Sequence, residues 1–427
     1  MSLVGVVTLL AIGFLLSNNK KAINLRTVGG ALAIQAAFGG FVLYVPVGKD
    51  ILKSISDAVS SVIGYAQNGI GFLFGDLANF KVGFIFAINV LPIIVFFSSL
   101  IAVLYYLGIM QWIIRIIGGA LQKALGTSRT ESMSATANIF VGQTEAPLVV
   151  RPFIPTMTQS ELFAIMVGGL ASIAGSVLAG YAQMGVPIQY LVAASFMAAP
   201  GGLLMAKLMH PETETAKNDM DELPDDPDKP ANVLDAAAAG ASSGMHLALN
   251  VGAMLLAFIG LIAMLNGIIG GIGGWFGVEN LTLELILGYI FMPLAYLIGV
   301  PWNEAMVAGS FIGQKIVVNE FVAYMNFAPY IHDAAMACTT VAADVTKELP
   351  MCVAETQAPM TARTMAIVSF ALCGFANLSS IAILLGGLGA MAPNRRHDLA
   401  KLGLRAVVAG SLANLMSATL AGLFLAL

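Results

Sequence analysis

The chain has 427 residues, of which 58% are hydrophobic and only 10% are charged, and its mean hydropathy is +0.86. Soluble domains carry about 25% charged residues, so this composition excludes a soluble globular protein and indicates an integral membrane protein. The formal net charge of −4 says little about partners, because it mostly reflects one acidic segment at 211–235.

Apolar, charge-free stretches recur along the chain, and most are long enough to cross a bilayer, which takes about 20 residues. They lie at 1–19, 27–48, 82–114, 162–206, 236–278, 364–394 and 406–427. The stretch 162–206 is long enough for two spans, with Gly185-Val186-Pro187 as the turn between them. Because these runs are continuous rather than short and alternating, the predicted class is an all-α polytopic membrane protein.

The first stretch, Met1–Ser17, lacks the basic region and the small-residue cleavage site of a signal peptide, so we expect a retained span. Basic residues then mark three segments that we expect to be cytoplasmic. They are Lys20, Lys21, Arg26, Arg115, Lys123, Arg129, Arg395, Arg396, Lys401 and Arg405. This places the N-terminus outside, and an even number of crossings places Leu427 outside too. The segment Pro211–Asp235 is expected to be a flexible, acidic cytoplasmic linker.

Two segments combine apolar and charged residues at helical spacing, at Lys49–Leu77 and Gln111–Leu125. Such amphipathic segments favour helices that lie at the membrane surface rather than crossing it.

Two further regions fit neither a plain span nor a loop. The region 133–155 is interrupted at Gly142–Glu145. The region 285–324 is interrupted at Gly299–Glu304 and then by Lys315 and Asn319-Glu320. Each is followed by a span rich in glycine and serine, at 170–180 and at 374–387. Paired interruptions in corresponding positions of two halves point to the binding site of a secondary transporter.

The first interruption holds an ionisable side chain at membrane depth, which is expensive and therefore suggests a functional site. Gln143, Thr144 and Glu145 together offer an amide, a hydroxyl and a carboxylate, a set that can read the edge of a heterocycle. An ion pair between Glu145 and Arg151 is the structural alternative. Asn138, with carbonyls freed by the break, and Ser172 could bind a small hard cation. Hydrogen bonding between helices is the alternative for these two.

The second half repeats this chemistry. Glu320 follows Asn319 in an apolar context, and Asn377 and Ser380 are three residues apart, so they share a helix face. Carboxylate and amide groups suit a ligand with several hydroxyls. Phe375 could pack on such a ligand or could be an ordinary core aromatic.

No nucleophile elbow and no phosphate-binding loop is present in the sequence, so we expect no enzyme activity. Transport would have to be driven by an ion gradient.

Three motifs occur in order: GQTEAP at 142–147, NEFVAY at 319–324 and GFANLSSI at 374–381. Together they resemble the concentrative nucleoside transporter family, notably its bacterial sodium-coupled members, over essentially the whole chain. The resemblance implies a homotrimer of protomers with eight transmembrane helices, interfacial helices and two re-entrant hairpins in inverted repeats. It also implies a scaffold domain and a transport domain that moves like an elevator.

Carried over by motif, the resemblance implies the following binding residues. The nucleobase would be read by Gln143, Thr144 and Glu145, with Val177 packing beside it. The ribose hydroxyls would be held by Glu320, Asn377 and Ser380, near Phe375. The co-transported sodium ion would be bound by Asn138, the Val141 carbonyl, Ser172 and the Ile173 carbonyl.

On the same basis we divide the chain into five segments. They are a scaffold at 1–125, a transport domain with the first hairpin at 126–208, the acidic linker at 209–242, a scaffold span at the trimer interface at 243–280, and a transport domain with the second hairpin at 281–427. The segment 331–363 is longer than expected and is interpreted as an insertion. Within it, Cys338 and Cys352 could form a disulfide or remain two thiols.

The predicted function is sodium-coupled symport of nucleosides such as uridine across a bacterial inner membrane, with both termini periplasmic. The expected partners are the nucleoside, sodium, lipid and two further copies of the chain, and no nucleic acid. Proton coupling through Glu145 or Glu320 is the alternative within the class. A nucleoside channel or a sensing receptor is the alternative outside it.

Overall fold

The structure is a computed structural model of the whole chain, and it describes residues 1–79, 84–216, 230–278, 281–331 and 360–427. Most of the expected insertion at 331–363 lies outside these residues, as do Cys338 and Cys352. Within the described ranges, every regular element is a helix. The all-α polytopic class predicted from the sequence is therefore confirmed.

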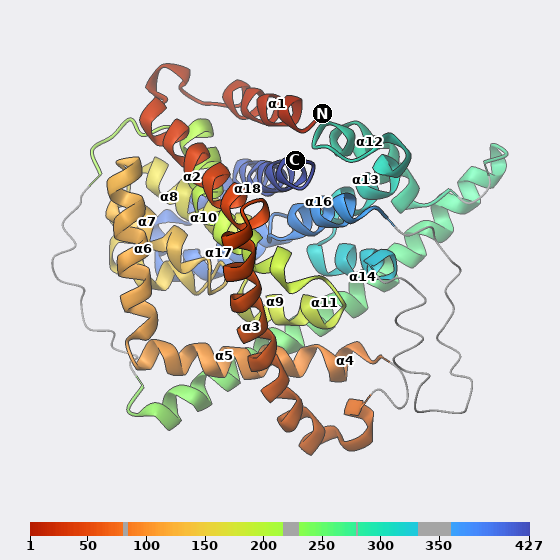
Figure 1. Cartoon of the computed structure of the whole chain (residues 1–427), viewed down its shortest axis with the longest axis horizontal. Helices are drawn as coiled ribbons and strands as arrows, with labels where there is room; N and C mark the ends of the chain where they lie inside the picture. The colour runs from red at the N-terminus through yellow and green to blue at the C-terminus, as the bar shows by residue number, and fades with distance from the viewer. Residues whose placement is uncertain (80–83, 217–229, 279–280, 332–359) are drawn as a thin grey trace.

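The helices follow one another as shown in Figure 1. They are α1 (Ser2–Leu15), α2 (Leu25–Leu43), α3 (Pro46–Phe74), α4 (Phe86–Asn89), α5 (Leu91–Tyr106), α6 (Ile109–Leu125), α7 (Arg129–Ala137), η3 (Ala146–Thr156), α8 (Gln159–Ala171), α9 (Gly175–Gln183), α10 (Ile188–Met209), α11 (Val233–Trp275), α12 (Leu283–Leu297), α13 (Trp302–Val317), α14 (Glu320–Ile331), α16 (Ala362–Leu372), α17 (Ser380–Met391) and α18 (Arg396–Phe424). Short 3-10 turns lie at Lys20–Ala22, Gly75–Asn79 and Pro393–Arg395.

Six helical segments in the described ranges are long and apolar enough to cross a membrane. They are α2, α4–α5, α8–α9, α10, α11 and the segment that ends with α18. The pair α12–α13 also passes this test, but it is bent by 117°, as a re-entrant segment would be. The shorter apolar helices are α1, α16 and α17. The eight crossings that the resemblance implies would require α1 and the broken pair α16–α17 to cross once each.

Both predicted amphipathic segments are helical, as α3 and α6. The buried residues of α6 recur every three or four positions, at Met110, Ile114, Gly118, Leu121 and Leu125. This spacing gives the helix one buried face, which packs against α7. The predicted turn before α10 is also present, and its Gly185 has φ +94°, a backbone conformation that favours glycine.

The core of the molecule lies around α8, α10, α16 and α18. In the apolar 18-residue stretches of α8–α9 and α10, 94% of the residues are buried, whereas only 17% are buried in the corresponding stretch of α11. The 43-residue α11 runs along the outside of the molecule and packs against α5 (Figure 1). Its exposed apolar surface is available to lipid or to other copies of the chain.

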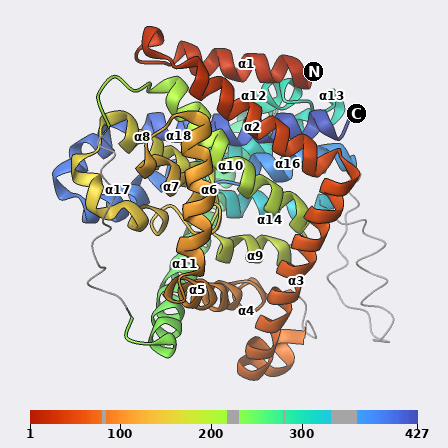
Figure 2. The ribbon, with the colours of Figure 1, turned by 60° about the vertical axis from the view of Figure 1, so that its left-hand side comes forward.

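The two chain termini lie near each other in both views (Figures 1 and 2). This proximity has a direct cause, because α1 packs against α18. The two ends of the chain therefore belong to one side of the fold.

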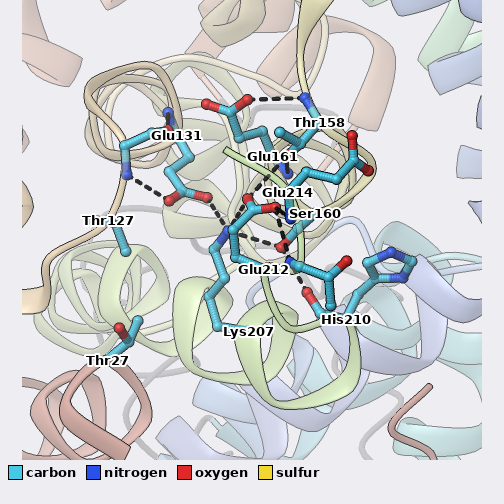
Figure 3. Close-up of polar contacts among 12 residues, drawn as sticks. Thr27, Thr127, Glu131, Thr158, Ser160, Glu161, Lys207, His210, Glu212 and Glu214 are labelled. Carbon is cyan, nitrogen blue, oxygen red and sulfur yellow. Dashed lines mark hydrogen bonds and ion pairs between the residues drawn. The ribbon is translucent and has the colours of Figure 1, made fainter. Parts of the chain in front are cut away.

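A buried ionic cluster ties the first hairpin to the core (Figure 3). Lys207, near the end of α10, is 6% exposed, and its Nζ lies 2.6 Å from Glu131 Oε2 on α7. The same Nζ donates a hydrogen bond of 2.9 Å to Ser160 Oγ on α8 and lies 3.6 Å from a Glu212 oxygen. A buried charge is tolerated only when it is paired, so this cluster fixes α7, α8 and α10 relative to one another.

Two of the predicted spans are interrupted, which the sequence did not predict. The stretch 162–206 contains a break between α8 and α9 at Ser172–Ala174, and the stretch 364–394 contains one between α16 and α17 at 373–379. Both breaks are stabilised by backbone contacts with other segments. Gly175 N donates to Phe140 O at 3.0 Å, and Leu378 N donates to Ile316 O at 3.2 Å.

The boundary of the predicted linker also differs. The helix α11 begins at Val233, so the last part of the segment 209–242 is already helical. The side chain of Asn232 caps this helix by accepting hydrogen bonds from the backbone N–H groups of Leu234 and Asp235. Such a cap satisfies donors that the helix cannot pair internally, and it explains why the helix starts before the apolar run does.

Candidate functional site

An open cavity lies where the first hairpin tip, α11, the start of α14 and the break before α17 meet. All eight residues predicted to bind substrate line the cavity: Gln143, Thr144, Glu145, Val177, Glu320, Phe375, Asn377 and Ser380. The fold thus brings together residues that lie up to 237 positions apart in the chain.

One end of the cavity is built around Glu320, the first residue of α14. Its Oε1 accepts a hydrogen bond of 3.1 Å from the Tyr181 hydroxyl, and its Oε2 accepts one of 2.9 Å from Asn377 Nδ2. Asn377 Oδ1 in turn accepts from Ser379 Oγ at 2.7 Å and from Ser380 N at 2.9 Å. Each carboxylate oxygen has two acceptor positions, so the carboxylate is fixed in orientation and can still accept from a ligand hydroxyl.

The other end is the first hairpin tip. Gln143 is 5% exposed, and its Nε2 has a 3.5 Å contact with Ser380 Oγ. Its Oε1 is buried and has no hydrogen-bond partner among the described residues. Thr144 packs against α17, since a Cβ at Gly387 would lie 2.7 Å from its methyl carbon. Glu145 is exposed and lines the cavity. Buried acceptors without partners are rare in folded proteins, so the tip has unused capacity for a polar ligand.

The apolar wall between these ends comes partly from a helix that the sequence analysis did not connect with the site. The helix α11 contributes Leu247, Val251, Met254 and Leu255. These four residues are all apolar, and such residues are common in every span, so nothing in the sequence marks them as part of the site. Tyr181, which orients Glu320, was also missed, because only its contact in three dimensions marks it.

Two buried oxygens next to the cavity have no hydrogen-bond partner among the described residues, Asn138 Oδ1 and Ser172 Oγ. Asn138 is 1% exposed and uses its amide nitrogen to donate to Ser134 O at 3.0 Å. The hydrogen bond from Gly175 N to Phe140 O holds the segment 138–141 against the break between α8 and α9. The four residues predicted to bind sodium therefore lie on two adjoining segments, the hairpin tip and this break.

Neutral oxygens freed by broken helices are typical ligands for sodium in secondary transporters. Each buried oxygen without a partner costs about 1–3 kcal/mol, a cost that a bound cation would offset. The residues present therefore fit a monovalent cation.

Two interrupted hairpins and two broken helices around a polar cavity define the class of secondary transporters. Comparison with known families specifies the class further. Residues 190–422 match the family described as Na+ dependent nucleoside transporter C-terminus, residues 4–77 match the corresponding N-terminus, and residues 87–187 match the family described as nucleoside recognition. The chain belongs to the concentrative nucleoside transporter family, as its motifs indicated.

Similar proteins occur in bacteria and animals. The nucleoside permease NupC of Helicobacter pylori is 51% identical over 432 residues, which cover 100% of this chain and 98% of the permease. An uncharacterized transporter of Haemophilus influenzae is 63% identical over 430 residues, covering 100% and 98%. Solute carrier family 28 member 3 of Homo sapiens is 40% identical over 424 residues, covering 98% of this chain and 59% of the human protein.

Among solved structures, CNTnw in an inward-facing, substrate-bound state has a TM-score of 0.91 and 61% identity, covering 99% of this chain and 97% of CNTnw. A CNTnw variant in an outward-facing state has a TM-score of 0.90 and 60% identity, covering 99% and 97%. CNTnw has thus been solved in both an inward-facing and an outward-facing state, which is consistent with alternating access. The chain is a multi-pass membrane protein for sodium-dependent nucleoside transport and is not an enzyme.

Proposed function

We propose that this protein couples the inward movement of sodium to the uptake of nucleosides such as uridine across a bacterial inner membrane. The observation that carries the proposal is the pairing of two chemistries in adjoining places. Asn138 and Ser172 have buried oxygens without hydrogen-bond partners among the described residues, to which a cation could bind. A cavity lined by carboxylates, amides and hydroxyls adjoins them.

The ribose binds at the Glu320 end of the cavity. The carboxylate accepts from ribose hydroxyls, and Asn377 and Ser380 supply further polar atoms on the same side. Because Glu320 is already held by Tyr181 and Asn377, it is oriented before the nucleoside arrives. Phe375 and Val177 pack on the apolar surface of the ligand.

The base binds at the hairpin tip. Gln143 has an unused acceptor, and Thr144 and Glu145 add a hydroxyl and a carboxylate. Together they can satisfy both donors and acceptors on the edge of a uracil ring.

Sodium binds between the hairpin and the break in the α8–α9 span, through Asn138, Ser172 and the carbonyls of Val141 and Ile173. It fixes the segment that leads directly to Gln143, so ion binding orders the base-reading residues. By linkage, the nucleoside raises the affinity for sodium by the same factor.

Translocation follows the elevator scheme that the family resemblance implies, with the hairpins and their broken spans moving past a fixed scaffold in each protomer of a homotrimer. The proximity of the two termini (Figures 1 and 2) supports an even number of crossings. With the basic segments in the cytoplasm, both termini are periplasmic.

Calorimetric titration of the purified protein with uridine tests this assignment. We expect uridine to bind at least tenfold more tightly in sodium than in choline at constant pH. The affinities for adenosine and guanosine, measured in the same way, define the base preference. Binding that responds to pH and not to sodium would favour proton coupling instead. Binding without sodium dependence in a protein that moves no uridine would indicate a receptor.

A further inference from the structure

The interior of the protein holds a second cationic group that none of the roles above uses. Lys315 lies on α13, close to the α13–α14 interruption, and is only 2% exposed. A lysine in such surroundings is expensive and usually functional, so the contacts of its ammonium group are informative.

Lys315 and Asn414 together bind carbonyls at the ends of two helices. Lys315 Nζ donates to Ala371 O at 2.9 Å and to Asn414 Oδ1 at 2.6 Å. Asn414 Nδ2 donates to Cys373 O at 2.9 Å and to Ala171 O at 2.6 Å. Ala371 and Cys373 lie at the end of α16, and Ala171 is the last residue of α8.

Carbonyls at the end of a helix lack internal partners and carry a partial negative charge, which a cation stabilises. The end of α8 has Ser172 next to it, where we place the transported sodium. The end of α16 has Lys315. The two broken spans occupy matching places in the element order, because each follows an interrupted hairpin. The second break thus has a lysine side chain in the place where the first break has the proposed ion.

The α16–α17 break leads straight to the ribose end of the cavity. Asn377 and Ser380 follow Cys373 within seven residues, and they have the hydrogen bonds to Glu320 and to each other described above. Phe375 N also donates to Ser172 O at 3.1 Å, which joins this break to the first one. A shift of the Cys373 carbonyl would therefore move the residues that contact the ribose.

We propose that Lys315 is a positioning residue for nucleoside recognition: through Asn414 it fixes the break between α16 and α17 and so aligns Asn377 and Ser380 with the ribose hydroxyls. This inference rests on the proposed binding of a nucleoside in the cavity. It assigns Lys315 no contact with the substrate.

The test compares two ligands that differ only in the ribose, uridine and 2′,3′-dideoxyuridine, by calorimetry at saturating sodium. The wild-type protein should bind uridine far more tightly. In Lys315→Met, uridine affinity should fall at least tenfold, while dideoxyuridine affinity changes little, so the ratio of the two dissociation constants approaches one. A merely structural defect would weaken both ligands together.

Lys207→Met is the matched control, because Lys207 is the other lysine buried among the described residues and belongs to the cluster that holds the first hairpin (Figure 3). It should lower the thermal stability and leave the ratio of dissociation constants unchanged. Asn414→Asp is the second variant and keeps the shape and the acceptor for Lys315. It removes the amide donor to Cys373 and Ala171. The ratio of the dissociation constants of dideoxyuridine and uridine should therefore fall toward one in this variant too, even where Lys315→Met does not fold.

The outcomes separate the two proposals. A wild-type protein that binds uridine and dideoxyuridine equally would contradict the ribose site itself. A wild-type protein that discriminates, with folded Lys315→Met or Asn414→Asp discriminating equally well, would overturn the role of Lys315. Loss of discrimination in Lys207→Met as well would also overturn it, because the effect would then be general.

Discussion

At the scale of single residues, side-chain oxygens are the ligands of the proposed cation site. Ser172 Oγ is buried and has no partner among the described residues. As a proposed sodium ligand, its hydroxyl would be a cost to the sodium-free protein and a gain when the ion is bound. Loss of this one oxygen should therefore affect the stability of the sodium-free protein and of the sodium-bound protein in opposite ways.

We expect Ser172→Ala to leave the melting temperature in sodium-free buffer unchanged or higher, because it removes a buried polar group worth about 1–3 kcal/mol. The increase in melting temperature on adding sodium should shrink markedly, because a bound ion stabilises in proportion to its affinity. A thermal scan against sodium concentration measures both effects.

Ser195→Ala is the matched control. Ser195 is buried, but its hydroxyl already donates to Leu191 O at 3.0 Å. Its loss should lower the melting temperature in both buffers and keep the sodium-induced increase. If Ser172→Ala behaves like this control, Ser172 is not a sodium ligand.

Glu320 makes a second prediction at this scale. Tyr181 and Asn377 donate to different oxygens of Glu320, and in glutamine one of these two positions is an NH2 group, which cannot accept a hydrogen bond. Glu320→Gln should therefore weaken uridine binding by about 10- to 100-fold, the equivalent of about 1.4–2.8 kcal/mol, and weaken dideoxyuridine binding much less.

Tyr181→Phe provides the comparison in calorimetry, since it removes one hydrogen bond and leaves the carboxylate. It should cost less uridine affinity than Glu320→Gln. A larger loss in Tyr181→Phe would show that the tyrosine, and not the carboxylate, dominates ribose recognition.

Much of the site could be predicted from the sequence for a physical reason. Polar groups such as Gln143 and Glu320 are costly at membrane depth, so they stand out against apolar neighbours. Val251 on α11 and Tyr181 on α9 do not, because apolar and aromatic residues are common in every span. Their place at the site depends on packing between distant segments, which a single sequence does not specify.

At the scale of elements, the interruptions decide the fold. Those next to polar motifs, at 142–145 and 319–320, were predicted from the sequence. The breaks at 172–174 and 373–379 were not, because glycine, alanine and serine are also normal in continuous membrane helices. What opens these breaks is tertiary contact, such as the hydrogen bond from Phe375 N to Ser172 O.

Gly374 gives a prediction for the second break. A Cβ at this position would lie 2.6 Å from Asn414 Nδ2, which is too close for any side chain. Gly374→Ala should therefore displace Asn414 from the helix ends and reduce sodium-driven uridine uptake by at least tenfold at equal expression.

Gly386→Ala, on α17 near the same break, is its control. A Cβ there meets nothing within 4 Å, so uptake should remain close to that of the wild type. Equal activity of the two variants would show that the close approach at Gly374 is not needed for transport.

At the scale of the whole molecule, the proposed trimer would use the exposed apolar surface of α11 as its contact. Leu256 in the middle of this helix is 80% exposed. Native mass spectrometry in mild detergent should give a species of about three times the 44.5 kDa chain mass. Leu256→Arg should dissociate it, whereas Leu3→Arg on α1, where Leu3 is 67% exposed, should not. A single-chain mass for the wild type would contradict the trimer.

The most direct test of the central claim is the accumulation of labelled uridine in proteoliposomes that hold the purified protein. An inward sodium gradient at equal pH should raise the uridine concentration inside the proteoliposomes above the external concentration. Collapsing the gradient should release the accumulated uridine. An inward proton gradient without sodium should give no accumulation. Accumulation driven by that proton gradient, or equilibration without accumulation under the sodium gradient, would contradict sodium-coupled uptake.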